Sequence, residues 1–88
     1  MTSVHIIISG FVQGVGFRKF VHKEGRRLGL SGWVQNLHNG TVEVNAIGEK
    51  EKLEELIEKC KKGSYFAEVD DVSVEWGEED SGDDFFIL

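Results

Sequence analysis

The chain has 88 residues, 40% of them hydrophobic, which is enough to bury one core and suits a single domain spanning residues 1–88. Its ten basic and sixteen acidic side chains leave a formal charge of −6, which disfavours general binding to nucleic acids. The lone cysteine, Cys60, excludes an internal disulfide, and no signal peptide or apolar run of roughly 18 residues is found, so we expect a soluble cytoplasmic protein without a membrane partner.

The first predicted element is a buried strand over residues 4–9, Val-His-Ile-Ile-Ile-Ser, since its isoleucines suit the pleated surface of a central strand. It leads into Gly-Phe-Val-Gln-Gly-Val-Gly-Phe-Arg at residues 10–18. Glycines in such a turn can take positive φ angles and direct backbone N–H groups to one point, and Arg18 falls where a helix should begin. The run therefore predicts a cradle for an anion such as a phosphoryl group.

The same glycines have another interpretation, because many turns between a strand and a helix contain glycine for packing alone. The spacing is not that of a P-loop, since no Lys-Ser/Thr pair follows the last glycine. It is not the dinucleotide-binding fingerprint either, because the third glycine of that motif is missing. From spacing alone, phosphate binding and a packing role both stay open.

Residues 18–28 predict the first helix. Gly29 stands where a left-handed cap ends a helix, and Gly25 in the interior is expected to cost up to about 1 kcal/mol relative to alanine. The apolar side chains that fall on one stripe of this helix are Phe17, Phe20, Val21 and Leu28.

Basic side chains gather at this helix, whereas residues 68–84 are strongly acidic. Positive potential near the glycine turn would help to steer a small anion towards it. A solvated helix face is the alternative explanation for all of these side chains except Arg18. The cluster consists of Arg18, Lys19, Lys23, Arg26 and Arg27.

A hairpin is predicted next, with strands over residues 32–37 and 41–47 and an Asn-Gly pair at its turn. Residues 50–61 then predict a second amphipathic helix, which Gly63 ends. Its apolar positions follow i, i+3, i+4, i+7 spacing and are occupied by Leu53, Leu56, Ile57 and Cys60. Because Cys60 belongs to this stripe, we interpret it as a core residue and not as a nucleophile.

Residues 69–76 predict a fourth strand and residues 85–88 a short fifth one, joined by a polar, acidic loop over residues 77–84. The order strand, helix, strand, strand, helix, strand is that of the split βαβ, ferredoxin-like sandwich. We therefore expect an α+β fold in which two helices cover one face of a five-stranded, mainly antiparallel sheet. This architecture serves enzymes, RNA readers and regulatory modules alike, so it does not by itself select a function.

Asn36, near the end of the strand over residues 32–37, is a further candidate for the site. Its amide carries a donor and an acceptor but no charge, so it can hold a water molecule near an anion without repelling that anion. Asparagines near turns also cap their own backbone, and that alternative stays open on the sequence alone.

Residues 10–18, followed by Ser-Gly-Trp-Val-Gln-Asn at residues 31–36, resemble the two signatures of the acylphosphatase family. The similarity extends through the hairpin, the second helix and the fourth strand, which is nearly the whole chain. This resemblance implies that Arg18 is the essential arginine of the family and that Asn36 is its water-orienting asparagine. It also implies a phosphate-binding loop made by the backbone N–H groups of Gln13, Gly14, Val15, Gly16 and Phe17.

Acylphosphatases hydrolyse the mixed anhydride of a carboxylic acid and phosphoric acid, releasing a carboxylate and inorganic phosphate without a metal ion. The resemblance therefore implies a small acyl phosphate as substrate, inorganic phosphate as product and inhibitor, no cofactor, and a monomeric enzyme. A carboxylate leaves without needing a proton, so no general acid is required. An oxygen of the substrate phosphate is our candidate for accepting the proton of the attacking water.

Other functions fit less well. A noncatalytic module of the same fold that holds a phosphorylated ligand is the main alternative, whereas an RNA reader is disfavoured by the charge of −6. The histidines lack a second histidine at metal-binding spacing, which favours structural or solvated roles for His5, His22 and His38.

Overall fold

The computed structural model describes all residues of the chain, 1–88. The elements, in chain order, are β1 (Thr2–Phe11), α1 (Phe17–Arg27), β2 (Ser31–Asn36), β3 (Val42–Gly48), α2 (Lys50–Lys62), β4 (Glu68–Glu78) and β5 (Phe85–Ile87). Every predicted element is present, in the predicted order. The largest differences are at strand ends: β1 is two residues longer at each end than expected, and β4 continues through residues 77–78, which had been assigned to a loop.

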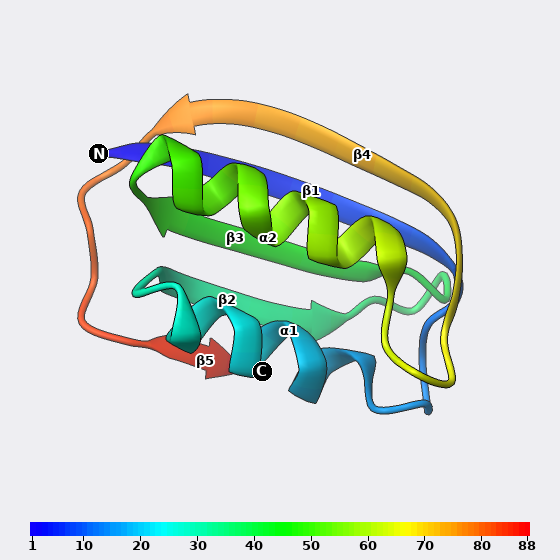
Figure 1. The fold of residues 1–88 in the computed structure, drawn as a ribbon. Helices are drawn as coiled ribbons and strands as arrows, with labels where there is room; N and C mark the ends of the chain where they lie inside the picture. Colours follow the sequence, from blue (N-terminus) through cyan, green and yellow to red (C-terminus); the bar gives the residue numbers. More distant parts are fainter.

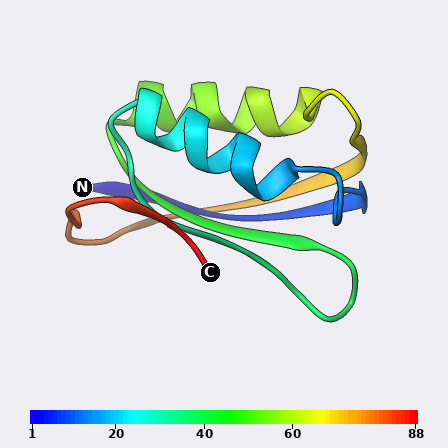
Figure 2. The ribbon, with the colours of Figure 1, turned by 90° about the horizontal axis from the view of Figure 1, so that it is seen from below.

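The strands form one five-stranded sheet in the order β4-β1-β3-β2-β5 (Figure 1). β1 pairs antiparallel with β3 and β4, and β2 pairs antiparallel with β3, whereas β5 runs parallel to β2. Both helices lie on the same face of this sheet, and the other face carries no helix (Figure 2). The expected ferredoxin-like α+β architecture with a mainly antiparallel sheet is therefore confirmed.

The core lies between the helices and the sheet, because alternate residues of each strand point towards the helices. Val4, Ile6 and Ile8 of β1 are fully buried there. α2 contributes its predicted stripe, with Leu53, Leu56, Ile57 and Cys60 all buried. Burial raises the pKa of the Cys60 thiol to about 12, so this thiol is a packing group and not a reactive thiolate. Neither helix has the length and apolar character that would let it cross a bilayer.

The connection from β1 to α1 begins with a close approach between two strands. The register of β1 against β4 shifts between Ser9 and Gly10, and Gly10 has a φ of +126°. A Cβ on Gly10 would lie 2.2 Å from the carbonyl oxygen of Glu68 in β4, so only glycine fits there. This contact fixes the point at which the chain leaves the sheet to form the glycine-rich loop.

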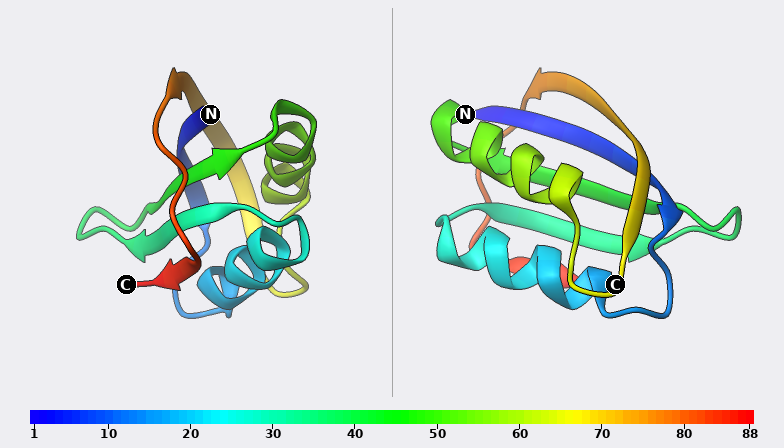
Figure 3. Two further views of the ribbon diagram at one scale, coloured as in Figure 1. Left: turned by 90° about the vertical axis from the view of Figure 1, so that its left-hand side faces the viewer. Right: turned by 45° about the vertical axis from the view of Figure 1, so that its right-hand side comes forward.

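The β2–β3 hairpin reaches the same end of the sheet, and its tip curls away from the helices (Figures 2 and 3). Asn39 caps the turn, since its Oδ1 accepts hydrogen bonds from the backbone N–H of Thr41 at 3.0 Å and from the Thr41 hydroxyl at 2.6 Å. Gly40 has a φ of +90°, as the predicted Asn-Gly turn requires. The end of β2 is thereby placed close to the start of α1.

Candidate active site

The loop of residues 12–16 joins β1 to α1 and has the backbone that an anion cradle needs. Gly14 and Gly16 have φ angles of +76° and +79°, and no residue other than glycine has a positive φ in this chain. Gly16 is the N-cap of α1, and no side chain caps this helix end or places a carboxylate in its first turn. The first N–H groups of α1 are therefore available to an external acceptor, and the positive end of the helix dipole favours an anion.

A pocket of about 290 Å³ opens beside this loop and contains both predicted catalytic residues. It draws its walls from the loop, from the first turn of α1, from the end of β2 and from β5. The lining residues are Val12, Gly14, Gly16, Phe17, Arg18, Lys19, Asn36 and Ile87. The fold thus brings Arg18 and Asn36 to one hollow, although they lie on different elements.

The Arg18 guanidinium is not paired with an aspartate or glutamate side chain. Its Nη1 donates one hydrogen bond, to the main-chain oxygen of Leu88 at 2.9 Å. A guanidinium has five N–H donors in a planar fork, so most of its donors remain available. Arg18 therefore combines a fixed anchor with unused donors at the pocket, an arrangement suited to binding an anion.

Asn36 presents an unusual polar group to the same pocket. It is the last residue of β2, opposite Val42 of β3, and its Oδ1 is buried without a hydrogen-bond partner. A buried, unsatisfied acceptor costs about 1–3 kcal/mol, so Asn36 keeps a hydrogen-bonding capacity that no other group of the protein uses. Asn39, and not Asn36, caps the hairpin turn, which removes the main alternative interpretation of Asn36.

The residues of the predicted phosphate-binding loop are not equivalent in the structure. Gly14, Gly16 and Phe17 line the pocket, whereas Gln13 and Val15 do not. The Val15 side chain packs against the core, and the Gln13 amide bonds to backbone carbonyl groups of the β2–β3 hairpin. Any contact that Gln13 or Val15 makes with substrate therefore depends on a backbone N–H group and not on a side chain.

Three pocket residues, Val12, Lys19 and Ile87, were not among the predicted site residues. For Lys19 the sequence left open a steering charge or a solvated helix face, and the structure places its exposed side chain at the pocket. Its position directly after Arg18 was the one available signal. Ile87 reaches the pocket because β5 pairs with β2 so that Ile87 lies opposite Val34, and the sequence contains no signal for that parallel register.

The remaining arginines of α1 are bound to carboxylates. Arg27 contacts Glu24 at 3.0 Å and Glu55 of α2 at 2.8 Å, which joins the two helices and lowers the pKa of Glu55 through the hydrogen bond from Arg27. Arg26 lies 3.7 Å from Asp84. The cationic side chains of α1 without an aspartate or glutamate partner are therefore Arg18 and Lys19, which line the pocket, and Lys23, which does not.

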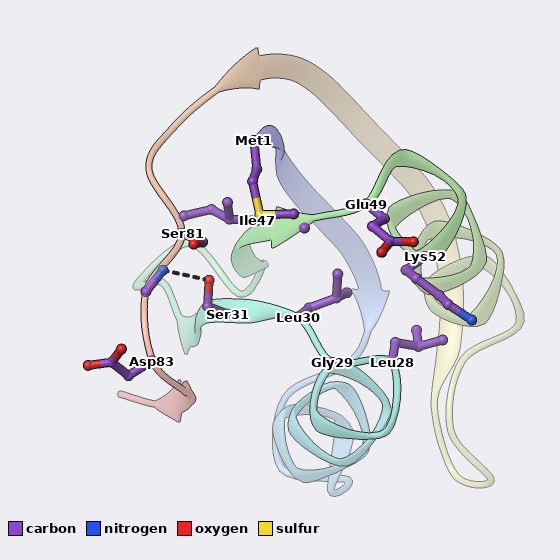
Figure 4. Close-up of a pocket in the computed structure, with 12 residues that line it drawn as sticks. Met1, Leu28, Gly29, Leu30, Ser31, Ile47, Glu49, Lys52, Ser81 and Asp83 are labelled. Carbon is purple, nitrogen blue, oxygen red and sulfur yellow. Dashed lines mark hydrogen bonds between the residues drawn. The ribbon is translucent and has the colours of Figure 1, made fainter.

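A larger hollow of about 350 Å³ lies at the opposite end of α1 and β2, beside Ser31, the first residue of β2 (Figure 4). Its only cationic side chain, Lys52, points away from the other lining residues, and the carboxylates of Glu49 and Asp83 oppose an anion there. Volume alone therefore does not identify the site. The smaller pocket is the better candidate, because it is lined by an arginine without an aspartate or glutamate partner and by an asparagine with an unsatisfied amide oxygen.

No group of three or more histidine, cysteine, aspartate or glutamate side chains lies close enough together to hold a metal ion. His5, one of the histidines considered above, lies instead on the open face of the sheet. Its Nε2 donates to Oε2 of Glu43 at 2.6 Å, and the Gln35 amide donates to Oε1 of the same carboxylate at 2.7 Å. These hydrogen bonds between strands agree with a structural role for His5.

Comparison with known proteins identifies the family. The acylphosphatase family model matches residues 4–87. An acylphosphatase of Anaeromyxobacter sp. is 48% identical over 77 residues, which cover 88% of this chain and 83% of the relative. An acylphosphatase of Moorella thermoacetica is 41% identical over 100% of this chain and 94% of the relative. The crystal structure of acylphosphatase from Bacillus subtilis matches with a TM-score of 0.96 and 42% identity, covering 100% of this chain and 99% of the other. The chain therefore belongs to the acylphosphatase family, whose members hydrolyse acyl phosphates.

Proposed function

We propose that the pocket between the glycine-rich loop and the end of β2 performs the family's reaction, with Arg18 and Asn36 as its catalytic residues. The observation that carries this proposal is that an arginine without an aspartate or glutamate partner lines the same hollow as an asparagine whose amide oxygen has no hydrogen-bond partner. The substrate is a small acyl phosphate, which the site holds by its phosphoryl end.

In this proposal, the phosphoryl group of the substrate binds in the cradle formed by the glycine-rich loop. Backbone N–H groups of residues 13–17 and the free donors of Arg18 bind its nonbridging oxygens. Phosphoryl transfer depends mainly on positioning and charge stabilisation, and preorganised donors supply both. Since the Arg18 guanidinium is already anchored to the main-chain oxygen of Leu88, little reorganisation is needed when charge develops on those oxygens.

Asn36 positions the attacking water. Its free Oδ1 accepts a hydrogen bond from that water, which leaves a lone pair of the water oxygen for the phosphorus. A bond forms between the water oxygen and phosphorus, the bond from phosphorus to the acyl oxygen breaks, and the carboxylate leaves with the electron pair. The proton of the water passes to an oxygen of the phosphate.

No general acid is needed, because a carboxylate is a stable leaving group at neutral pH. The pocket lining contains no histidine, aspartate or glutamate side chain that could act as a general acid. The polar side chains in the lining are those of Arg18, Lys19 and Asn36, which can bind an anion and hold a water molecule. This composition favours an acyl phosphate over a phosphate ester, whose alkoxide leaving group requires protonation.

We also expect the enzyme to be a monomer in the cytoplasm. We expect residues 1–88 to act as one catalytic domain and as a monomer, since both proposed catalytic residues come from one chain. A reducing cytoplasm suits the single cysteine, which is buried in the core. Inorganic phosphate, the product, competes with the substrate for the cradle and acts as an inhibitor.

Hydrolysis of benzoyl phosphate in the presence of a metal chelator tests the proposal. The unaltered protein should be active, and Arg18→Ala and Asn36→Ala should each lower the rate by at least about two orders of magnitude, as the loss of a transition-state donor does. Arg26→Ala is the matched control, because Arg26 is on the same helix but pairs with Asp84 outside the pocket. A rate no faster than the blank for the unaltered protein, or full activity in either pocket variant, would contradict the proposal.

A further inference from the structure

The side chain of Gln13 connects the phosphate-binding loop to the strand end that carries Asn36. Its Nε2 donates to the carbonyl oxygen of Leu37 at 2.7 Å and to that of Thr41 at 2.9 Å. A side-chain amide has two N–H donors, so both are used in this contact. Gln13 is thus bound to the hairpin and not to the pocket.

The two acceptors define the base of the β2–β3 hairpin. Leu37 directly follows Asn36, and its backbone N–H donates to the same Thr41 carbonyl group at 2.9 Å. Gln13 therefore contacts the hairpin where β2 ends and the turn begins. A displacement of Leu37 would move Asn36 with it, since the two residues share a peptide bond.

No other side-chain hydrogen bond joins residues 12–16 to the β2–β3 hairpin. The Asn36 Oδ1 has no partner of its own, so hydrogen bonds of that atom do not fix its place. The distance between the cradle and the amide oxygen of Asn36 consequently depends on backbone pairing and on Gln13.

We propose that Gln13 is a positioning residue, which sets the distance between the bound phosphoryl group and the water held by Asn36. This inference rests on the proposed function. In-line attack tolerates little misplacement, since an error of about 1 Å costs on the order of 100-fold in rate. The loop itself is shaped by its glycines, so phosphate binding does not require the Gln13 amide.

The test is Gln13→Leu, which keeps most of the side-chain volume and removes both donors. It should lower kcat for benzoyl phosphate by about 10-fold to 100-fold and leave the inhibition constant of inorganic phosphate within about twofold. The matched control is Gln35→Leu, because the Gln35 amide donates to Glu43 on the open face of the sheet, and this change should leave both constants unaltered. If Gln13→Leu does not fold, Gln13→Met, which keeps the unbranched side chain, is measured in its place.

A double-mutant cycle shows whether Gln13 acts through Asn36. In an Asn36→Ala background, Gln13→Leu should lower kcat by less than about twofold further, because no water is left to position. Equal losses in both backgrounds, or weakened phosphate inhibition in Gln13→Leu, would show a general role in loop structure and overturn the inference. An inactive parent protein would refute the proposed function, whereas an active parent with unimpaired Gln13→Leu would refute this inference alone.

Discussion

At the scale of single residues, Arg18 differs from the other arginines of α1 in what its guanidinium contacts. Arg26 and Arg27 are paired with side-chain carboxylates, whereas Arg18 contacts the main-chain oxygen of Leu88 and lines the pocket. The residue type alone does not distinguish these side chains. Their position along the helix does, because only the first turn of α1 faces the end of β2.

Lys19 provides a prediction about the charge around the pocket. Since its exposed side chain lines the opening, Lys19→Ala should raise the KM for benzoyl phosphate by about 2-fold to 5-fold at low ionic strength, with kcat unchanged. At about 0.5 M salt the difference should largely disappear because of screening. Lys23→Ala, a change on the same helix at a residue that does not line the pocket, should have a smaller effect. Equal effects of the two changes would exclude a specific contribution of Lys19.

Glu43 provides a prediction about pH. Its pKa is held below the ordinary value of 4.5 by the hydrogen bond from His5 and then by that from Gln35. A lowered pKa in the folded state means that the carboxylate stabilises the fold above about pH 4.5 and loses this contribution as the pH falls through the lower value. Glu43→Gln should therefore lower the free energy of unfolding at pH 7 and weaken the decline of this free energy as the pH falls below about 4.5.

Urea unfolding at a series of pH values measures this dependence. Glu58→Gln is the control, because Glu58 is an exposed residue of α2 at 3.6 Å from Lys61. It should reproduce the acid-induced decline of the unaltered protein, since exposed ion pairs contribute little. If Glu43→Gln followed the same curve as Glu58→Gln, the network between strands would not be a source of acid sensitivity.

At the scale of elements, α1 and β5 fit together through a glycine. Gly25 is buried in the helix, and a Cβ added there would lie 2.7 Å from Cδ2 of the buried Phe85 ring. The sequence predicted only the unfavourable helix propensity of Gly25. In the structure, the absence of a side chain at Gly25 makes room for the aromatic ring of Phe85, which holds β5 against the sheet.

Gly25→Ala should consequently destabilise the protein, although alanine is the better helix former by about 1 kcal/mol. Forcing a methyl group against a buried ring typically costs about 1–3 kcal/mol, so the free energy of unfolding in urea should fall. In a Phe85→Leu background, where the ring is absent, the same change should cost less or become stabilising. A stabilising effect of Gly25→Ala in the unaltered protein would show that the contact is loose.

Most elements could be predicted from local pattern. The isoleucines of β1, the helical spacing of Leu53, Leu56 and Ile57, and the Asn-Gly turn each determine structure through neighbours close in the chain. The parallel pairing of β5 with β2 could not be predicted, because it depends on which distant edge is left unpaired. Ile87 was missed as a pocket residue for this reason, whereas the hydrogen-bond partners of Gln13 were missed because they lie 24 and 28 residues away in the chain.

At the scale of the whole molecule, the fold brings the ends of separate segments to one end of the sheet. The loop after β1, the first turn of α1, the end of β2 and the end of β5 meet at the pocket, while the core lies between sheet and helices. The site therefore depends on register between strands as much as on its own residues. That dependence explains why one side chain, Gln13, can affect the alignment of groups that it does not touch.

The central claim is that Arg18 and the cradle bind the phosphoryl group, whereas Asn36 orients the attacking water. The most direct test is to measure the inhibition constant of inorganic phosphate alongside kcat in both alanine variants. Asn36→Ala should lose about 100-fold or more in kcat and keep phosphate inhibition within about threefold, whereas Arg18→Ala should lose both. Phosphate inhibition that is unchanged in Arg18→Ala, or abolished in Asn36→Ala, would contradict this account.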